Sequence, residues 1–331
     1  MSFGKDAETM TTNQLELPKQ QLEKTNTVLA FAILFVAVVA LSTAGIFIRL
    51  SEREISPIAT GFHRLWIASV VFGLWNGVNY TNNRLSDNPT DQQKPYTSGR
   101  VGLLLAAAAV SALALLVWNW SVSQTSVASA TLLRNSNALF TPLLGWLLFG
   151  QRYDSKFLIG MVVAIGGMIA IGLQDIQIAN SNLQGDTAAL LVGMLLSVFF
   201  LIAEQLRTKL STTTILLWRC GIGAALILPL FLLAEDRFFP YSEVGWLAVI
   251  AQAVICQALG QGLLVYSLKR MTSGFISIVI PLEVIFAAIA AWVVFSEEVS
   301  LFNCLAFAVV VLGIYLAKSS QSAVKPIEEK K

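Results

Sequence analysis

Long uninterrupted apolar stretches dominate the sequence, and short polar segments separate them. Neither the 3.6-residue periodicity of an amphipathic helix nor the alternation of a half-buried strand produces such stretches. A helix that crosses the hydrocarbon core of a bilayer needs roughly 20 apolar residues. The pattern predicts an all-α polytopic membrane protein with ten transmembrane helices, at Val28–Ile48, Pro57–Gly77, Val101–Trp120, Thr125–Phe149, Phe157–Leu173, Thr187–Gln205, Thr212–Leu233, Val244–Leu268, Thr272–Phe295 and Leu301–Ala317.

Composition identifies the lipid bilayer as the main solvent of the chain. Of its 331 residues 56% are hydrophobic and only 13% are charged, whereas roughly a quarter of the residues of a soluble domain are charged. The net charge of +2 comes from Lys and Arg in short loops beside apolar stretches, so no nucleic-acid partner is indicated. Cys220, Cys256 and Cys304 lie in apolar stretches without metal-ligand spacing, and we expect neither a metal nor a cofactor.

The distribution of basic residues predicts the orientation. With a cytoplasmic N-terminus, most of the 22 Lys and Arg lie in cytoplasmic loops and tails, as the positive-inside rule requires. The exceptions are Arg49, Arg53 and Arg237 on the outer side and Arg64, Arg134 and Arg219 within predicted spans. An even number of spans returns the C-terminus to the cytoplasm.

Five spans per half make the second half enter the membrane from the opposite side. We therefore expect two inverted five-helix repeats, residues 27–174 and 175–318, flanked by polar cytoplasmic tails at residues 1–26 and 319–331. Arg64 and Arg219 occupy similar places early in the second span of each half, which agrees with an internal repeat. Inverted halves can expose one central site to either side in turn, so the topology indicates a secondary transporter.

Local motifs support a family resemblance. Phe149-Gly150-Gln151-Arg152 ends the fourth span and precedes a span with Gly160, Gly166 and Gly167, while Phe295-Ser296-Glu297-Glu298 ends the ninth. With these motifs and the ten-helix plan, the chain from about Leu29 to Ala317 resembles the EamA-like branch of the drug/metabolite transporter superfamily. Gln151 departs from the family's Gly-Glu pair, and Pro142 and Pro281 are displaced from the usual proline position.

The resemblance implies transport of a small metabolite, commonly export of an amino acid or a related carboxylate-bearing compound, through a cavity between the halves. Carriers of organic phosphates or cationic drugs and a non-transporting membrane scaffold are the alternatives. No span carries a nucleophile with its base or a phosphate-binding glycine loop, so we do not expect an enzyme. The expected location is a bacterial inner (plasma) membrane.

Charges inside spans are the main candidates for a binding site, because each costs about 2.5 to 3.5 kcal/mol at a helix centre. Arg134 in the fourth span and Glu283 in the ninth are both near the expected midplane. One hypothesis has Arg134 bind a carboxylate through its planar fork, with Asn135 and Asn137 completing the polar wall. The alternative is a structural ion pair between Arg134 and Glu283.

Other intramembrane polar residues leave similar choices open. Glu283 could take up a proton and couple transport to the proton gradient. Gln257 and Gln261 either line the cavity or hydrogen-bond between helices. Arg64 and Arg219 either act as gates or snorkel toward headgroups. Trp118 is predicted to anchor the aromatic belt, with an outer gate as the alternative.

Overall fold

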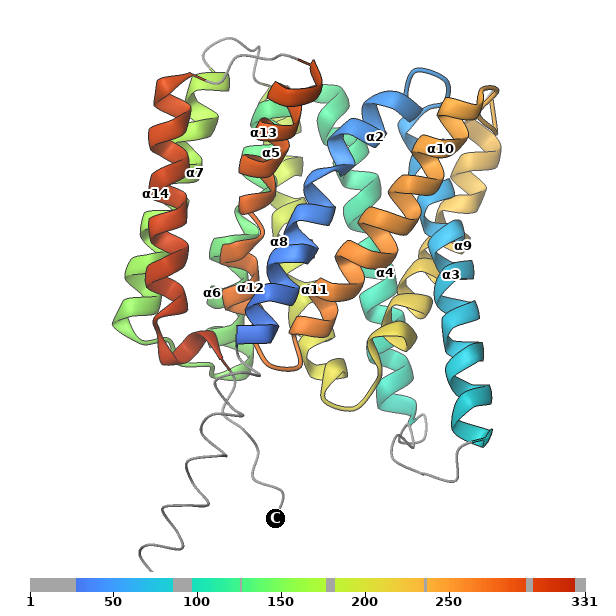
Figure 1. The fold of residues 1–331 in the computed structure, drawn as a ribbon, viewed down its shortest axis with the longest axis horizontal. Helices are drawn as coiled ribbons and strands as arrows, with labels where there is room; N and C mark the ends of the chain where they lie inside the picture. Colours follow the sequence, from blue (N-terminus) through green and yellow to red (C-terminus); the bar gives the residue numbers. More distant parts are fainter. Residues whose placement is uncertain are drawn as a thin grey trace, which may run out of the picture.

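The computed structural model describes residues 28–85, 97–125, 127–176, 182–234, 237–295 and 300–324 as a bundle of helices (Figure 1). In these ranges the only β pairing is an isolated bridge between Met271 and Val324. The chain adopts helices because lipid offers no hydrogen-bond partners, so each backbone N–H must bond within its own segment.

The first helical stretch, Val28–Ser51, has one turn residue at Thr43 and ends in α2 (Ala44–Ser51). The elements that follow are α3 (Pro57–Leu85), α4 (Ser98–Gln124), α5 (Val127–Arg134), α6 (Asn137–Phe149), α7 (Ser155–Ile176), α8 (Leu183–Arg207), α9 (Thr212–Ala234), α10 (Glu243–Ala251), the π-helix η1 (Gln252–Gly260), α11 (Gln261–Ser267), α12 (Ser273–Val279), α13 (Leu282–Phe295), α14 (Leu301–Lys318) and the short 3-10 helix η2 (Gln321–Ala323).

Helices occupy all ten stretches predicted from the sequence, with ends that differ by a few residues. Within the described ranges, seven are long and apolar enough to cross a membrane. They are Val28–Ser51, Pro57–Val78, Ser98–Val122, Leu183–Arg207, Thr212–Leu233, Glu243–Ser267 and Leu301–Lys318. The predicted fifth span is α7, whose apolar part Ser155–Ile171 falls just short of the required length.

The predicted fourth and ninth spans are not continuous helices, which corrects the sequence-based expectation. The fourth consists of α5 and α6 separated by Asn135 and Ser136, and the ninth of α12 and α13 separated by Ile280 and Pro281. Each half-helix has only 7 to 14 residues, too few to cross the hydrocarbon core alone. Each break therefore lies partway along its predicted span.

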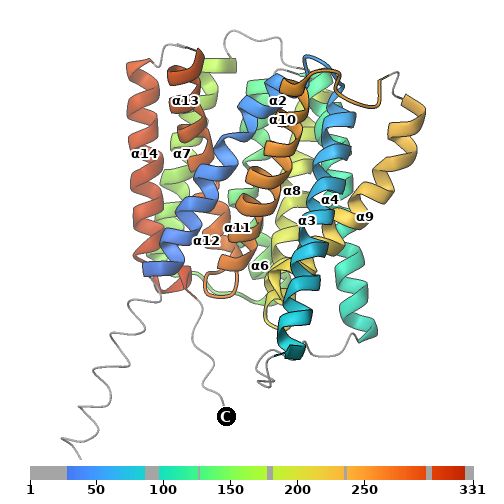
Figure 2. The same cartoon turned by 45° about the vertical axis from the view of Figure 1, so that its right-hand side comes forward.

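The largest helix contacts join the first half of the chain to the second. α7 packs against α14, α4 against α8, and α3 against α9. Figures 1 and 2 show α7 and α14 side by side at one edge of the bundle. A Cβ atom on Gly167 would lie 2.8 Å from the backbone nitrogen of Val310, so glycine allows the two backbones of that pair to approach closely.

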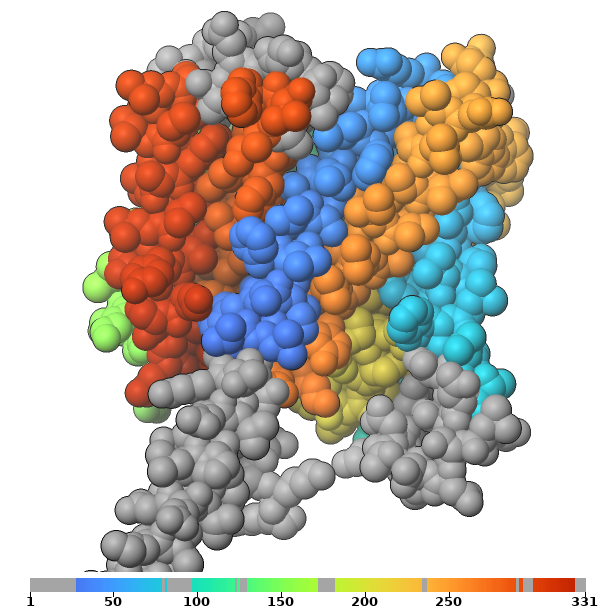
Figure 3. All heavy atoms as spheres, viewed as in Figure 1, coloured from blue at the N-terminus to red at the C-terminus, as the bar shows by residue number. Residues whose placement is uncertain are grey.

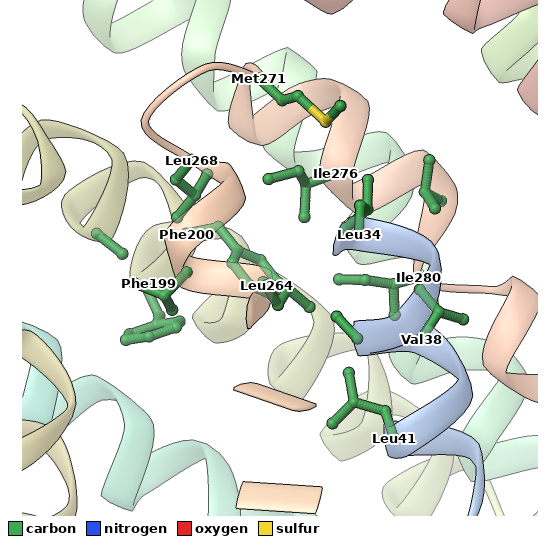
Figure 4. Packing of buried hydrophobic residues seen from close by; sticks show 14 of the residues in the cluster. Leu34, Val38, Leu41, Phe199, Phe200, Leu264, Leu268, Met271, Ile276 and Ile280 are labelled. Atoms are coloured by element: carbon green, nitrogen blue, oxygen red, sulfur yellow. The ribbon is translucent and has the colours of Figure 1, made fainter. Parts of the chain in front are cut away.

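A continuous apolar core connects the helices near the two discontinuities. Leu34 and Val38 of the first span face Ile276 and Ile280, while Leu264 lies beside the two phenylalanines of α8 (Figure 4). In the space-filling view the first span and the α10–α11 helix lie against one another along their length, which closes this face of the bundle (Figure 3). Dense packing therefore holds the broken helices in place.

Residues 28 and 324 lie at the same end of the bundle, which we call the terminal end (Figure 1). There Asp154 accepts hydrogen bonds from the Ser320 hydroxyl (2.6 Å) and from the backbone N–H groups of Phe157 and Gln321. Burial acts to raise the pKa of Asp154, but these hydrogen bonds hold it below its ordinary value. Ala323 is fully buried and Val324 pairs with Met271, so the start of the predicted C-terminal tail packs against the bundle.

At the opposite end, Glu54 joins the loop after α2 to the start of α10. Its carboxylate accepts hydrogen bonds from the backbone N–H groups of Tyr241 and Ser242, at 3.1 Å each, and from the Ser242 hydroxyl. The bond from the Ser242 side chain lowers the pKa of Glu54. The two ends of the bundle are thus each held by a carboxylate that links the two halves of the chain.

Candidate functional site

The two charges that the sequence predicts near the midplane meet at the breaks in the fourth and ninth spans. Nη2 of Arg134 lies 2.6 Å from Oε1 of Glu283, which makes the two side chains an ion pair. Arg134 is the last residue of α5 and Glu283 lies in the first turn of α13. A helix C-terminus favours a cation and an N-terminus an anion, so both helix dipoles stabilise the charges they carry.

Local sequence explains the two breaks differently. Asn135 and Ser136 have short polar side chains that compete with helical backbone bonding, whereas Pro281 lacks the N–H that a continuous helix would need. Pro142, by contrast, lies inside the continuous helix α6. Gly193 of α8 packs against the first break, where an added Cβ would lie 2.8 Å from the carbonyl oxygen of Arg134.

Trp118 contacts the ion pair. Its ring lies 5.0 Å from Cζ of Arg134, within the range of a cation–π interaction. The side chain is half-buried, and its role as a belt anchor or an outer gate stays a prediction. Arg134 keeps 27% of its side-chain surface exposed and Glu283 keeps 18%, so the helices around the pair do not enclose it completely.

Asn135 and Asn137 are placed beside Arg134 in the chain but are almost fully buried, at 4% and 2% exposure. The carbonyl of Asn137 accepts hydrogen bonds from Thr141 and from Ser197 of α8. Both asparagines therefore pack at the first break against the helices around it. In this conformation they do not line open space.

Arg64 and Arg219 point into the bundle and meet the two glutamines predicted on the eighth span. Nε of Arg64 donates to Oε1 of Gln257 and Nη1 of Arg219 donates to Oε1 of Gln261, each at 2.9 Å. Phe199 stacks on the guanidinium of Arg219 at 4.1 Å. The sequence left two roles open for these arginines, a gate or snorkelling toward lipid headgroups. Snorkelling does not match the contacts, because both side chains bond to glutamines inside the bundle.

Gln257 lies in the π-helix η1, and Gln261 begins the α-helix that follows it. π-helical turns are rare and occur mainly at functional sites, because they redirect side chains within a continuous helix. Nε2 of Gln257 donates to Sγ of Cys220, 3.5 Å away, which leaves its amide oxygen toward Arg64. The backbone irregularity and this bond together orient the glutamine.

His63 has both ring nitrogens engaged in hydrogen bonds. The indole N–H of Trp66 donates to Nδ1 at 2.9 Å, and Nε2 lies 2.6 Å from the carbonyl oxygen of Phe238. These partners require the neutral tautomer with the proton on Nε2, since Nδ1 must accept. The histidine has a structural role in this arrangement, and the residue is fully buried.

Sequence reasoning missed a polar cluster at the terminal end. Oε2 of Glu204 accepts from the backbone N–H of Ser273 at the start of α12, at 3.1 Å. Tyr153 donates to Gln151 at 2.6 Å, and burial together with nearby Glu204 raises the pKa of Tyr153. No local pattern in the sequence relates Glu204 to Ser273, which lies 69 positions away. Among the described residues no group of three or more His, Cys, Asp or Glu could hold a metal ion.

Comparison with known proteins decides the family. The model of the EamA-like transporter family matches residues 28–173 and again residues 183–318. The chain belongs to the EamA-like transporter family. The resemblance found in the sequence is thereby confirmed, and the protein is an integral membrane protein of a transporter family rather than of an enzyme family.

Relatives of this EamA-like protein are described as transporters of unassigned activity. An uncharacterized transporter of Archaeoglobus fulgidus is 24% identical over 298 residues, which cover 87% of this chain and 97% of that protein. The uncharacterized transporter YetK of Bacillus subtilis is 24% identical over 224 residues, covering 64% of this chain and 66% of that protein. A solved crystal structure at 16% identity covers 88% of this chain and 96% of its own, with a TM-score of 0.73, and it shows the fold.

Proposed function

We propose that the protein is a secondary transporter that exports a small carboxylate-bearing metabolite, an amino acid or a related compound, by alternating access. The observation that carries this proposal is the Arg134–Glu283 ion pair between two broken helices. Discontinuous helices at the interface of two repeats are typical of the substrate sites of secondary transporters, because half-helix ends stabilise bound charge. The family membership supports the transporter assignment.

Arg134 is the proposed ligand of the substrate carboxylate. Its guanidinium can form two parallel hydrogen bonds with a carboxylate, and Trp118 holds one face of its plane. In the resting protein Glu283 occupies one of the positions that the substrate would take. The substrate therefore binds by competing with Glu283 for Arg134.

Two inverted halves are the proposed basis of alternating access. The family model matches the chain twice, and α7 with α14 and α3 with α9 are contacts between helices in corresponding places of the two halves. At the terminal end α6 packs against α12. We propose that separation of α6 from α12 opens the site to the terminal end. The excess of basic residues in the loops predicted at this end supports its placement in the cytoplasm.

Transport and folding assays on Arg134→Gln test the substrate role. The variant is expected to lose most counterflow of a carboxylate substrate in proteoliposomes, because a neutral amide cannot replace the charge-assisted fork. Arg53→Gln, the same change in an exposed loop, serves as the control and is expected to transport normally. Normal transport by a well-folded Arg134→Gln protein would remove the binding role.

A further inference from the structure

The interior of the bundle carries more positive charge than its carboxylates neutralise. Arg134 is paired with Glu283, while Glu204 and Arg207 near the terminal end add one charge of each sign. Arg64 and Arg219 remain, and in the described part of the chain neither has a carboxylate within ion-pair distance. Their hydrogen-bond partners Gln257 and Gln261 are neutral amides.

The two arginines are close to one another. Arg64 donates to Gln257, and Gln257 in turn donates to Sγ of Cys220, the residue next to Arg219, so Gln257 connects the surroundings of the two arginines. The two arginines come from α3 and α9, which pack together, and they bind glutamines one helical turn apart on the eighth span. Two cations held together in a low-dielectric interior repel strongly, and an anion between them would relieve this repulsion.

The hydrogen bonds of both guanidinium groups leave N–H groups that can donate to an anion. Arg219 is only 9% exposed, and its buried Nε has no hydrogen-bond partner among the described residues. Arg64 uses Nε for Gln257, so its two terminal nitrogens, for which the described residues provide no hydrogen bond, are available as a parallel fork. Phe199 covers a face of Arg219 and leaves its in-plane N–H groups available.

We propose that Arg64 and Arg219 form a second anion-binding subsite, and that the transported compound therefore carries two carboxylates, as in a dicarboxylate or an acidic amino acid. One carboxylate binds Arg134 and the other binds between Arg64 and Arg219. This inference rests on the proposed transport function. Trp118, which contacts Arg134, lies on α4, and α4 packs against α9, the helix that carries Arg219. The two proposed subsites therefore belong to neighbouring helices, and one small molecule with two carboxylates would span them.

Matched pairs of probes test the second subsite. Succinate against its monoamide, and glutamate against glutamine, differ in one negative charge at nearly constant shape. Purified protein in lipid nanodiscs is expected to bind each dicarboxylate at least about tenfold more tightly than its amide, the usual gain from a charge-assisted hydrogen bond. Arg64→Gln and Arg219→Gln should bring the ratio close to one, because each variant removes one of the two cations that the second carboxylate would contact.

Controls separate this proposal from the proposed function. Arg219→Lys keeps the charge and should retain part of the preference if the Gln variant folds poorly, and Arg53→Gln should behave as the unmodified protein. Three results would overturn the second subsite. They are equal affinity for both members of each pair, no binding of any dicarboxylate, and a preference that survives in a folded Arg64→Gln/Arg219→Gln protein. Tighter binding of glycerol phosphate than of every dicarboxylate would also overturn it, because one dianionic group would then fill the pair. The proposed function would still hold if Arg134→Gln lost counterflow while the unmodified protein transported both members of each probe pair equally.

Discussion

At the residue scale, the charges of the bundle interior are held mainly by aromatic rings and amides. Trp118 and Phe199 cover the guanidinium planes of Arg134 and Arg219, and Gln261 accepts a hydrogen bond from the latter. Such partners orient an arginine without neutralising it, so its charge remains available to a substrate. Glu283 is the exception, because it both orients and neutralises Arg134.

Asp154 provides a pH-dependent test of the terminal end. Since its pKa is lower in the folded protein than the ordinary value of about 3.9, its ionised form stabilises the fold. This contribution is complete above the ordinary pKa and disappears as the pH falls through the folded-state pKa. Asp154→Asn is therefore expected to lower the melting temperature at pH 7 and to differ less from the unmodified protein below about pH 4.

Thermal unfolding in detergent at pH 7 and pH 3.5 would measure this difference. Ser320→Ala removes one donor to the same carboxylate and should lose part of the same pH-dependent stability. A constant difference between Asp154→Asn and the unmodified protein across this range would contradict the assignment.

At the element scale, the position of the site depends on two interrupted helices. A continuous helix through residues 134–137 would rotate the residues that follow, because each residue turns an α-helix by about 100°. The break after α5 ends that helix at Arg134, while α13 begins just before Glu283. The interruptions thus bring into contact two side chains 149 positions apart in the sequence.

Gly193→Ala tests whether the first break positions Arg134. The added methyl group would lie 2.8 Å from the Arg134 carbonyl oxygen and would also meet the Ser136 hydroxyl, so the break must shift. We expect a destabilisation of about 1–3 kcal/mol and a marked loss of transport, measured at equal amounts of folded protein. Gly262→Ala, where an added Cβ meets nothing within 4 Å, is the control and should transport normally.

Neighbouring glycines in α7 offer a matched test of its contact with α14. A Cβ on Gly167 would lie 2.7 Å from Cγ2 of Val310 and 3.1 Å from the carbonyl oxygen of Ala306, whereas one on Gly166 meets nothing within 4 Å. Gly167→Ala should therefore lower the free energy of unfolding by about 1–3 kcal/mol. Gly166→Ala should change it by less than about 1 kcal/mol, because only helix propensity changes. Equal effects in denaturant unfolding would refute the close approach.

At the scale of the whole molecule, the two halves of the chain interleave rather than fold side by side. The largest contacts, α7 with α14, α4 with α8 and α3 with α9, all connect the halves. Neither half can bury its contact surfaces alone, so we expect the bundle to depend on both. The same interface contains the charged site, which means that relative motion of the halves would alter access to it.

Coupling to protons is a prediction about the transport cycle as a whole. When a substrate carboxylate takes Arg134, Glu283 loses its cation in a low-dielectric interior and favours the neutral, protonated form. We expect Glu283→Gln to make transport much less dependent on pH, measured as counterflow and pH-gradient-driven flux in proteoliposomes. An unchanged pH profile in a folded, active variant would exclude this coupling.

The sequence alone determined the helical character of the protein. Apolar stretches of about 20 residues can only become helices in lipid, since backbone hydrogen bonds must then be local. Helices accordingly occupy all ten predicted stretches, and the EamA-like resemblance followed from short motifs that are also local. Ten crossings in two inverted halves, with both tails in the cytoplasm, remain a prediction from the same pattern.

Only the tertiary structure decided which polar groups meet. Arg64 and Gln257 are 193 positions apart, and Arg219 and Gln261 are 42 apart, so no periodicity relates them. The breaks at residues 135–136 and 280–281 also depend on neighbours such as Gly193, which lies on another helix. Helix formation is fixed by hydrogen bonds within a segment, whereas the site is fixed by contacts between segments, and these depend on how side chains from distant parts of the chain fit together.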